Sequence, residues 1–215
     1  MFEFFSTNLI WSQGQAILLI IALIALLGFF SRFFLIFALC AFIFSLYFFR
    51  NPLRSCPAAL TDSTIIVCPA DGKVVDVAPY TSDSSYNFTQ KVSIFLSPID
   101  VHVNWIPFTG TIEKMEYVPG KFLMAFLPKS SELNEHHDIV IRNGEKVLLV
   151  RQIAGIIARR ICWWINEGQT VQQGQTYGMI RFGSRVDILL PSTAQVAVQK
   201  GERVYGGQTI LARWE

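Results

Sequence analysis

The sequence predicts a mainly β domain with few short helices, preceded by an N-terminal helical hairpin that is transmembrane or re-entrant. Three observations predict this fold class. Short runs of β-prone residues recur after residue 55, with Gly, Pro, Asn and Ser between them. A turn pattern built on two glycines occurs twice towards the C-terminus. Nearly every residue from Ala16 to Phe49 is apolar, and charged residues make up only 16% of the 215-residue chain, against about 25% in a typical soluble domain.

The apolar segment defines a first predicted unit, residues 1–54, which we interpret as a membrane anchor. Gly28 and the pair Ser31-Arg32 interrupt it, and each half is near or below the roughly 17–25 apolar residues that a membrane-spanning helix needs. The interruption predicts two short apolar helices joined by a tight turn. One long kinked helix is an alternative. A buried pair of core helices is another, although the segment lacks the polar face that such helices present to water.

The flanks of this segment predict its orientation. Arg50 and Arg54 follow it directly, and basic flanks favour the cytoplasmic side of a membrane, whereas Arg32 at the turn favours the opposite orientation. None of the four cysteines stands at the CxxC spacing, which is typical of a protein in a reducing compartment without a disulfide framework or a zinc site. We therefore expect the cell (inner) membrane, with the following domain on the cytoplasmic side. The net charge of +2 is too small to indicate a nucleic-acid partner.

Residues 55–215 form the second predicted unit, a β-rich domain. Its expected strands are Ile65–Cys68, Lys73–Val77, Val92–Leu96, Gly110–Tyr117, Ile139–Arg142, Val147–Ala154, Met179–Phe182, Val186–Leu190, Gln195–Gln199 and Thr209–Arg213. The polar segment from Pro128 to Asp138 is predicted to be a mobile loop.

The repeated turn pattern narrows the β architecture. Residues 168–176 read Gly-x-x-Val-x-x-Gly-Gln-Thr, and residues 201–209 repeat the same spacing. Each glycine suits a tight turn and each valine a short strand. This spacing resembles the turns of lipoyl- and biotinyl-type barrel-sandwich domains. The carrier lysine of such domains is missing from its usual setting, because Lys114 is best explained as a surface strand residue.

Three histidines are the first candidates for chemistry. His102 follows an apolar strand that Pro98 ends, and it alternates with Asp100 and Asn104, so these three polar side chains share one face of an extended segment. His136 and His137 lie in the polar segment and are better explained as a solvated loop pair than as catalytic or metal-binding residues. No third ligand stands at a spacing typical of zinc, so no metal is expected.

Two further motifs have both a structural and a chemical interpretation. Asp71-Gly72 is a strong turn signal, but Asp71 can also be the carboxylate that orients a catalytic histidine. Gly183-Ser184 interrupts a strand pattern and is explained by a β-bulge. The alternative is that the Ser184 hydroxyl bends back onto the preceding carbonyl, as an N→O acyl shift requires.

Taken in order, these motifs cover nearly the whole chain and resemble those of the phosphatidylserine decarboxylase family, in its short, membrane-anchored, pyruvoyl-dependent form. The matching segments are Phe48–Pro52, Pro69–Gly72, Ser97–Asn104, Gln152–Gly155 with Ala158–Arg160, and Phe182–Asp187 followed by Leu190-Pro191.

The resemblance implies a proenzyme that cuts itself between Gly183 and Ser184, giving a β chain (1–183) and an α chain (184–215) that stay together. Ser184 would become a pyruvoyl group, a covalent cofactor that decarboxylates phosphatidylserine in the membrane to phosphatidylethanolamine and CO2 through a Schiff base. The resemblance assigns His102 as the base for cleavage and the proton donor after CO2 leaves, and Asp71 as the residue that orients His102.

The chain departs from the pattern of longer family members at Trp105, where they carry a second histidine. Either His102 performs both steps here, or one of His136 and His137 supplies the second role. The residues expected to contact substrate are Arg159, Arg160, His136 and His137. A homodimer is also expected.

Two other functions compete with this hypothesis. A non-enzymatic, membrane-tethered barrel-sandwich adaptor would explain the repeated turns and the apolar segment. A metallopeptidase-like β domain would use His102 with the histidine pair.

Overall fold

The computed structural model describes residues 13–81, 86–121, 133–155, 160–181 and 184–215. The chain divides into two compact units, Met1–Leu53 and Arg54–Glu215. Among the predicted site residues, Arg159 and Gly183 lie outside the described residues.

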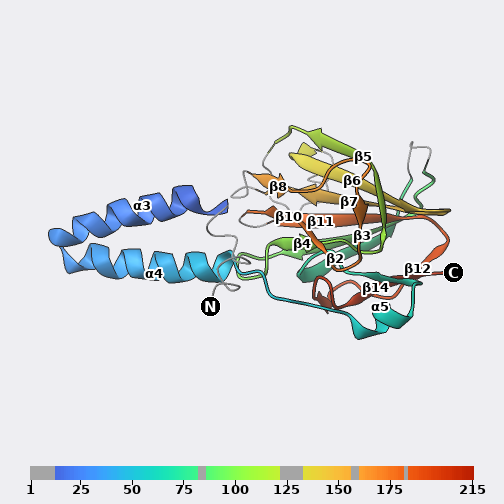
Figure 1. The fold of residues 1–215 in the computed structure, drawn as a ribbon, viewed down its shortest axis with the longest axis horizontal. Helices are drawn as coiled ribbons and strands as arrows, with labels where there is room; N and C mark the ends of the chain where they lie inside the picture. The colour runs from blue at the N-terminus through green and yellow to red at the C-terminus, as the bar shows by residue number, and fades with distance from the viewer. Residues whose placement is uncertain (1–12, 82–85, 122–132, 156–159, 182–183) are drawn as a thin grey trace. The chain divides into compact units, whose positions relative to one another are not determined.

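The first unit is a pair of apolar helices. Helix α3 (Gln15–Leu26) leads through the 3-10 turn η1 (Leu27–Phe29) into helix α4 (Arg32–Phe48), and Figure 1 shows the two helices side by side. The Ser31 hydroxyl caps α4 by accepting a hydrogen bond from the Phe33 N–H at 3.3 Å. The predicted break between two short helices is therefore present.

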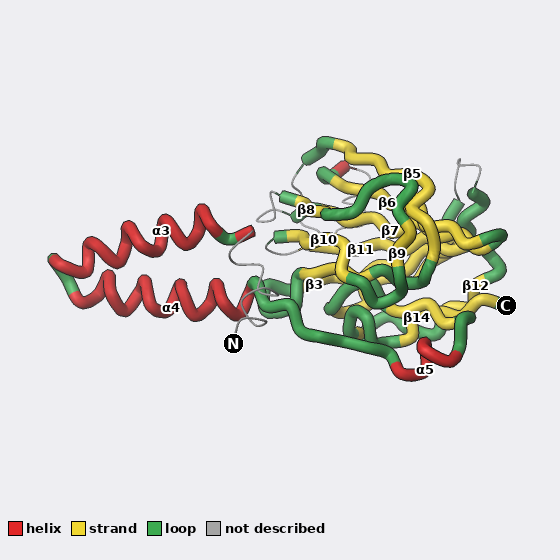
Figure 2. Tube along the Cα trace, viewed as in Figure 1, coloured by secondary structure: helices red, strands yellow, loops and turns green. Residues whose placement is uncertain are grey.

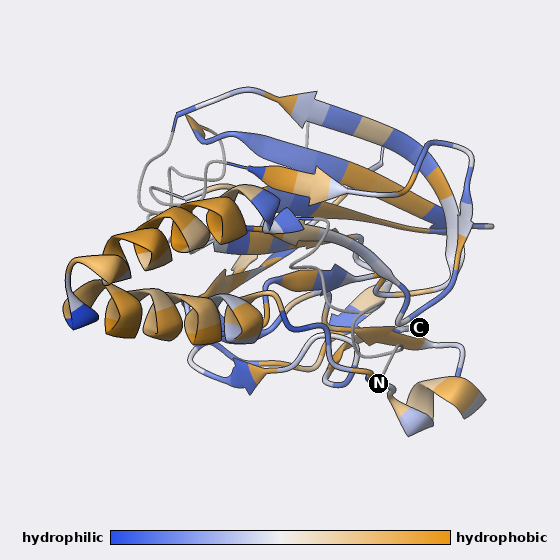
Figure 3. Cartoon of the chain, turned by 60° about the vertical axis from the view of Figure 1, so that its left-hand side comes forward, coloured by the Kyte–Doolittle hydropathy of each residue, from blue (hydrophilic) through white to orange (hydrophobic). Residues whose placement is uncertain are grey.

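These helices are apolar on nearly all sides, as the hydropathy colours of Figure 3 show. Large side chains of this unit are exposed: Phe33 of α4 by 68% and Phe29 of η1 by 92%. Within the described part of the chain, no helix combines the length and the hydropathy needed to cross a membrane. The membrane anchor accordingly stays a prediction.

The second unit is mainly β, as predicted (Figure 2). A short helix α5 (Pro57–Thr61) precedes the strands β1 (Ile65–Val67), β2 (Gly72–Pro79), β3 (Gln90–Leu96), β4 (Val103–Trp105), β5 (Gly110–Val118), β6 (His136–Asn143), β7 (Lys146–Ile153), β8 (Ile161–Trp163), β9 (Thr170–Val171), β10 (Thr176–Ile180), β11 (Ser184–Leu190), β12 (Ala194–Val196), β13 (Arg203–Val204) and β14 (Ile210–Trp214).

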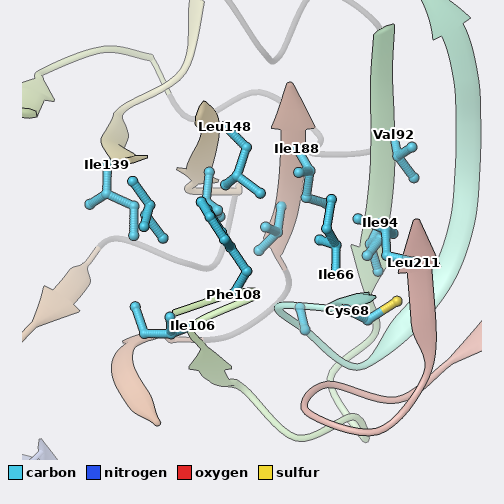
Figure 4. Close-up of a cluster of buried hydrophobic side chains, with 14 of the residues drawn as sticks. Ile66, Cys68, Val92, Ile94, Ile106, Phe108, Ile139, Leu148, Ile188 and Leu211 are labelled. Atoms are coloured by element: carbon cyan, nitrogen blue, oxygen red, sulfur yellow. The ribbon is translucent and has the colours of Figure 1, made fainter. Parts of the chain in front are cut away.

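The strands form three antiparallel sheets. The large sheet has the order β13-β2-β3-β11-β7-β6-β5-β9, and the two small sheets are β4-β10-β8 and β1-β14-β12. One buried cluster joins all three sheets, because it contains Ile180 of β10, Ile188 of β11 and Leu211 of β14. Figure 4 shows part of this cluster. The large sheet therefore turns one face to this core, and the small sheets pack on the same side.

The repeated turns are confirmed in detail. Their glycines at 168, 174, 201 and 207 all have positive φ, between 70° and 94°, a conformation that side chains with a Cβ rarely adopt. The valine of each repeat lies in a two-residue strand, β9 or β13.

The prediction of a loop up to Asp138 is wrong for its last residues. His136, His137 and Asp138 are the first residues of β6, and all three are buried. The reason is that their backbones pair with β7, and that β7 supplies polar partners to two of the buried side chains: Gln152 contacts His137, and Arg151 holds Asp138 at 2.8 and 2.7 Å.

A candidate active site at the start of strand β11

Two chain connections meet at one end of the large sheet. Strand β3 ends at Leu96, and the chain then continues through residues 97–102 to β4. Strand β10 leads to β11, whose first residue, Ser184, pairs with Leu96. On the other side, the Ile180 N–H donates to the His102 carbonyl at 3.2 Å. The structure thus brings His102 and Ser184, which are 82 positions apart in the sequence, to the same end of the sheet.

Ser184 occupies an unusual position for a hydroxyl. It is fully buried, and its Oγ has no hydrogen-bond partner among the described residues. Side chains alternate along a strand, so Ser184 lies on the same face as Val186 and Ile188, which belong to the hydrophobic core. A buried hydroxyl without a partner is costly and is typical of a functional group rather than a structural one.

The next residue, Arg185, points to the opposite face of β11. Its guanidinium binds Asp187 at 2.6 Å and Ser93 Oγ at 2.7 Å, and all three side chains are buried. This network anchors the start of β11 from the face that Ser184 does not use.

The ring of His102 has a defined tautomer. Its Nδ1 lies 2.9 Å from the backbone oxygen of Asp100, which can only accept, so Nδ1 carries a proton. In the neutral ring Nε2 then keeps its lone pair and can accept a proton from a hydroxyl. The residue is fully buried, at the base of β4.

Asp100 builds the turn that positions His102. Its Oδ2 accepts hydrogen bonds from the Ser97 N–H and the Ser97 hydroxyl, both at 2.7 Å, and its Oδ1 accepts one from Arg203 of β13. The alternation of Asp100, His102 and Asn104 predicts a polar row, but these partners only become visible in the fold.

Asp71 lies in a separate group of contacts. Its buried carboxylate forms an ion pair with Arg54, with one contact of 2.9 Å to Arg54 Nη2, and accepts the Gly206 N–H at 2.9 Å. The Arg54 guanidinium in turn lies 4.9 Å from the centre of the Trp105 ring. No hydrogen bond from Asp71 to His102 is found among the described residues, and the orienting role of Asp71 stays a prediction.

His136 and His137 lie in different environments. His136 Nδ1 lies 2.8 Å from the Asn134 carbonyl. His137 is buried, stacks on the Trp163 ring at 4.0 Å, and contacts Gln152 through Nδ1 at 3.1 Å. Burial lowers the pKa of His137 below its usual value, because a charged imidazole is disfavoured away from water.

Gln152 is a candidate site residue that the sequence reasoning missed, and its partner is Asn104, which was expected on the same face as His102. Both are fully buried, and Gln152 Nε2 donates to Asn104 Oδ1 at 2.7 Å. The signal was present: Gln152 follows Leu148 and Val150 at the alternate positions of β7 that face the core, where a polar residue needs a reason.

Arg160, the remaining described candidate for substrate contact, lies at the surface. Arg160 is exposed, and its carbonyl accepts the Arg181 N–H at 3.2 Å. Among the described His, Cys, Asp and Glu side chains, no group of three is placed to hold a metal ion.

The fold is mainly β, and it places a buried serine, Ser184, and a buried histidine, His102, at one end of the large sheet. The chain belongs to the phosphatidylserine decarboxylase family, whose model matches residues 41–212, and the class of enzyme is a carboxy-lyase. The resemblance stated from the sequence is thereby confirmed.

Relatives from two bacterial groups carry the same name, phosphatidylserine decarboxylase proenzyme. The protein from Chlorobium chlorochromatii is 46% identical over 83% of this chain and 82% of its own length. That from Ehrlichia ruminantium (strain Gardel) is 44% identical over 96% of this chain and 91% of its own, and that from Ehrlichia chaffeensis is 47% identical over 78% and 74%.

Proposed function

We propose that this chain is a proenzyme that cuts itself between Gly183 and Ser184, converts Ser184 to a pyruvoyl group, and then decarboxylates phosphatidylserine to phosphatidylethanolamine and CO2. The observation that carries the proposal is the buried Ser184 hydroxyl at the first position of β11, which has no hydrogen-bond partner among the described residues. Family membership and the names of the relatives support the substrate.

In the proposed cleavage, Ser184 Oγ loses its proton to His102 and attacks the carbonyl carbon of residue 183. The peptide C–N bond breaks, the proton passes to the released amine, and an ester replaces the amide. Loss of the Ser184 Cα proton then breaks the bond between Ser184 Cβ and Oγ. This leaves a carboxylate on residue 183 and a dehydroalanine at 184. Water then hydrolyses the dehydroalanine: its nitrogen leaves as ammonia, and a keto group takes its place.

The strand pairing supports a mature enzyme of two associated chains. The fragment 184–215 would contain β11, which lies between β3 and β7, and β14, which pairs with β1. Four strands of this fragment therefore contribute to two sheets, and cutting one peptide bond before β11 leaves all of these pairs in place.

The described residues fit the pyruvoyl group because they bury its precursor on an apolar face. The group supplies an electrophilic carbonyl that takes up the electrons left when CO2 departs. The polypeptide excludes water through its core, and His102 would deliver a proton to the carbon that lost CO2. Asp71 as its orienting partner, and Arg159, Arg160, His136 and His137 as substrate contacts, remain parts of the proposal.

The lipid substrate explains the apolar first unit. Lifting two acyl chains into water would cost about 0.8 kcal/mol for each exposed CH2 group. We propose that α3 and α4 dip into the inner membrane from the cytoplasmic side, so that only the head group has to leave the bilayer. Their exposed leucines and phenylalanines support this placement.

The mass of the purified protein tests the proposal. We expect two chains, with the smaller one starting at residue 184 and carrying a keto group instead of an amine. Ser184→Ala should remain a single chain without activity. Ser93→Ala is the matched control, since Ser93 is also a fully buried serine on the neighbouring strand, and it should still be cut. A single uncut chain that still releases CO2 from the lipid would refute the proposal.

A further inference from the structure

Three buried polar side chains form a hydrogen-bonded chain next to the candidate active site. His137 of β6 contacts Gln152 of β7 at 3.1 Å, and Gln152 contacts Asn104 of β4 at 2.7 Å. At most 1% of each residue is exposed. This hydrogen-bonded chain of side chains therefore links the large sheet to the small sheet β4-β10-β8 within the protein interior.

The chemistry of the amides gives this chain a direction. Asn104 Oδ1 can only accept, so Gln152 must donate from Nε2, which turns Gln152 Oε1 towards His137 Nδ1–H. Asn104 consequently presents its Nδ2–H donors at the far end. Nδ2 is buried and has no partner among the described residues. A buried donor without a partner is rare in folded proteins, and a bound ligand or water is what satisfies such a group.

Gln152, which holds the Asn104 amide, is a diagonal neighbour of residue 184. Gln152 pairs with Val186 of β11, and Ser184 is two positions further along the same face. Diagonal neighbours of this kind are about 7–8 Å apart. Gly178 of β10 pairs with Asn104 and leaves room for the contact, because a Cβ there would lie 2.9 Å from Gln152 Nε2.

We infer that Asn104 Nδ2 binds the carboxylate of the serine head group, and that Gln152 and His137 are positioning residues that hold the amide in this orientation. The inference rests on the proposed function, in which the substrate nitrogen bonds to residue 184. The carboxylate is attached to the carbon next to that nitrogen, so it has to lie within a few ångströms of residue 184, where Asn104 offers its donor.

A neutral donor suits this reaction. The carboxylate loses its charge as CO2 forms, so a strong ionic contact would stabilise the substrate more than the transition state and slow the step. An amide orients the carboxylate with a weaker contact that is less costly to lose. Specificity for the carboxylated head group over the product follows from the same contact.

The variant Gln152→Glu tests the inference with little change in shape. A carboxylate at 152 accepts from both neighbours, so it would keep the His137 contact and turn Asn104 Nδ2 towards itself, which withdraws the donor from the substrate. Asn104→Leu removes the donor outright. Gln90→Glu is the matched control, because Gln90 is a partly buried amide at the opposite end of β3 that donates to two carbonyls.

The readout is reductive trapping of lipid amines on fragment 184–215 with cyanoborohydride, measured by mass in detergent micelles of phosphatidylserine or phosphatidylethanolamine. We expect Gln152→Glu and Asn104→Leu to be cut normally and to lower the serine-to-ethanolamine trapping ratio at least about tenfold relative to wild type, the size of one hydrogen bond to a charged group. Gln90→Glu should keep the wild-type ratio.

The outcomes distinguish a failure of the Asn104 assignment from a failure of the proposed function. An unchanged ratio in both variants, or the loss of cleavage in either, would overturn the assignment of Asn104 to the carboxylate. A wild-type protein that is not cut, or that traps neither lipid, would instead refute the proposed function itself.

Discussion

Replacing Arg54 by methionine should strongly destabilise the β domain, because it leaves the buried Asp71 carboxylate without its cationic partner. The side chains of Arg54 and Asp71 are only 10% and 5% exposed, and the guanidinium contacts both carboxylate oxygens. In Arg54→Met, the one hydrogen bond that the Asp71 carboxylate keeps within the described part of the chain comes from the Gly206 N–H at 2.9 Å. Methionine retains most of the apolar stem, so the main change is the loss of charge compensation.

The magnitude follows from the burial of the pair. Removing one partner of a buried ion pair typically costs about 3–5 kcal/mol of unfolding free energy. For a chain of this size, each kcal/mol shifts Tm by about 2–4 °C, so a fall of roughly 6–20 °C is expected. The double variant Arg54→Met with Asp71→Asn should recover most of the loss, because a neutral amide still accepts the Gly206 N–H without carrying a buried charge.

Thermal unfolding of the uncut Ser184→Ala protein in detergent is the assay, since a single chain avoids mixtures of precursor and product. Arg142→Met is the control: its ion pair with Glu113 is exposed by 40% and 35%, and such pairs contribute little, so Tm should move by less than about 4 °C. Equal shifts for Arg54→Met and Arg142→Met, or a double variant no more stable than Arg54→Met, would show that the Arg54–Asp71 pair is not the buried, mutually dependent contact described here.

Three further predictions concern the core and the site. Burial lowers the pKa of His137, so the folded protein binds fewer protons there than the unfolded chain does. The free energy of unfolding should therefore fall as the pH drops below about 6.5 towards the folded-state pKa. In urea titrations, the difference in this free energy between pH 7.5 and pH 5 should be smaller in His137→Gln than in wild type. Gly178→Ala places a Cβ 2.7 Å from the Cys162 carbonyl and 2.9 Å from Gln152 Nε2, so both Tm and the serine-to-ethanolamine trapping ratio should fall, and an unchanged ratio would show that Gln152 tolerates displacement. Ile188→Ala in the fully buried cluster should cost about 2–5 kcal/mol in chemical denaturation, and a cost below 1 kcal/mol would contradict the close packing around β11.

The strands of the β domain could largely be predicted because their signals are local. Alternation and turn residues located β2, β3, β5, β7, β11 and β14 to within a few positions. Strands β4 and β8 and helix α5 were missed, since three to five residues are too few to show a period. His136 and His137 were assigned to a loop because their polarity outweighed a pairing with β7 that only the assembled sheet provides.

The site was predictable in its chemical groups but not in its contacts. Ser184 and His102 stand out in the sequence through their motifs, and the fold brings them to one sheet end. The partner of Asp71 was not foreseeable: nothing in the sequence indicates that Arg54, 17 positions earlier, takes both carboxylate oxygens.

By itself, the amino-acid sequence determined the periodic strands, the positive-φ turns, the apolar helices and the family, since each depends on neighbouring residues or on their order along the chain. The tertiary structure alone decided that Asn104, Gln152 and His137 form one buried hydrogen-bonded chain. Those contacts depend on which strands pair and on which side chains of two packed sheets face each other, and strand alternation carries no information about either.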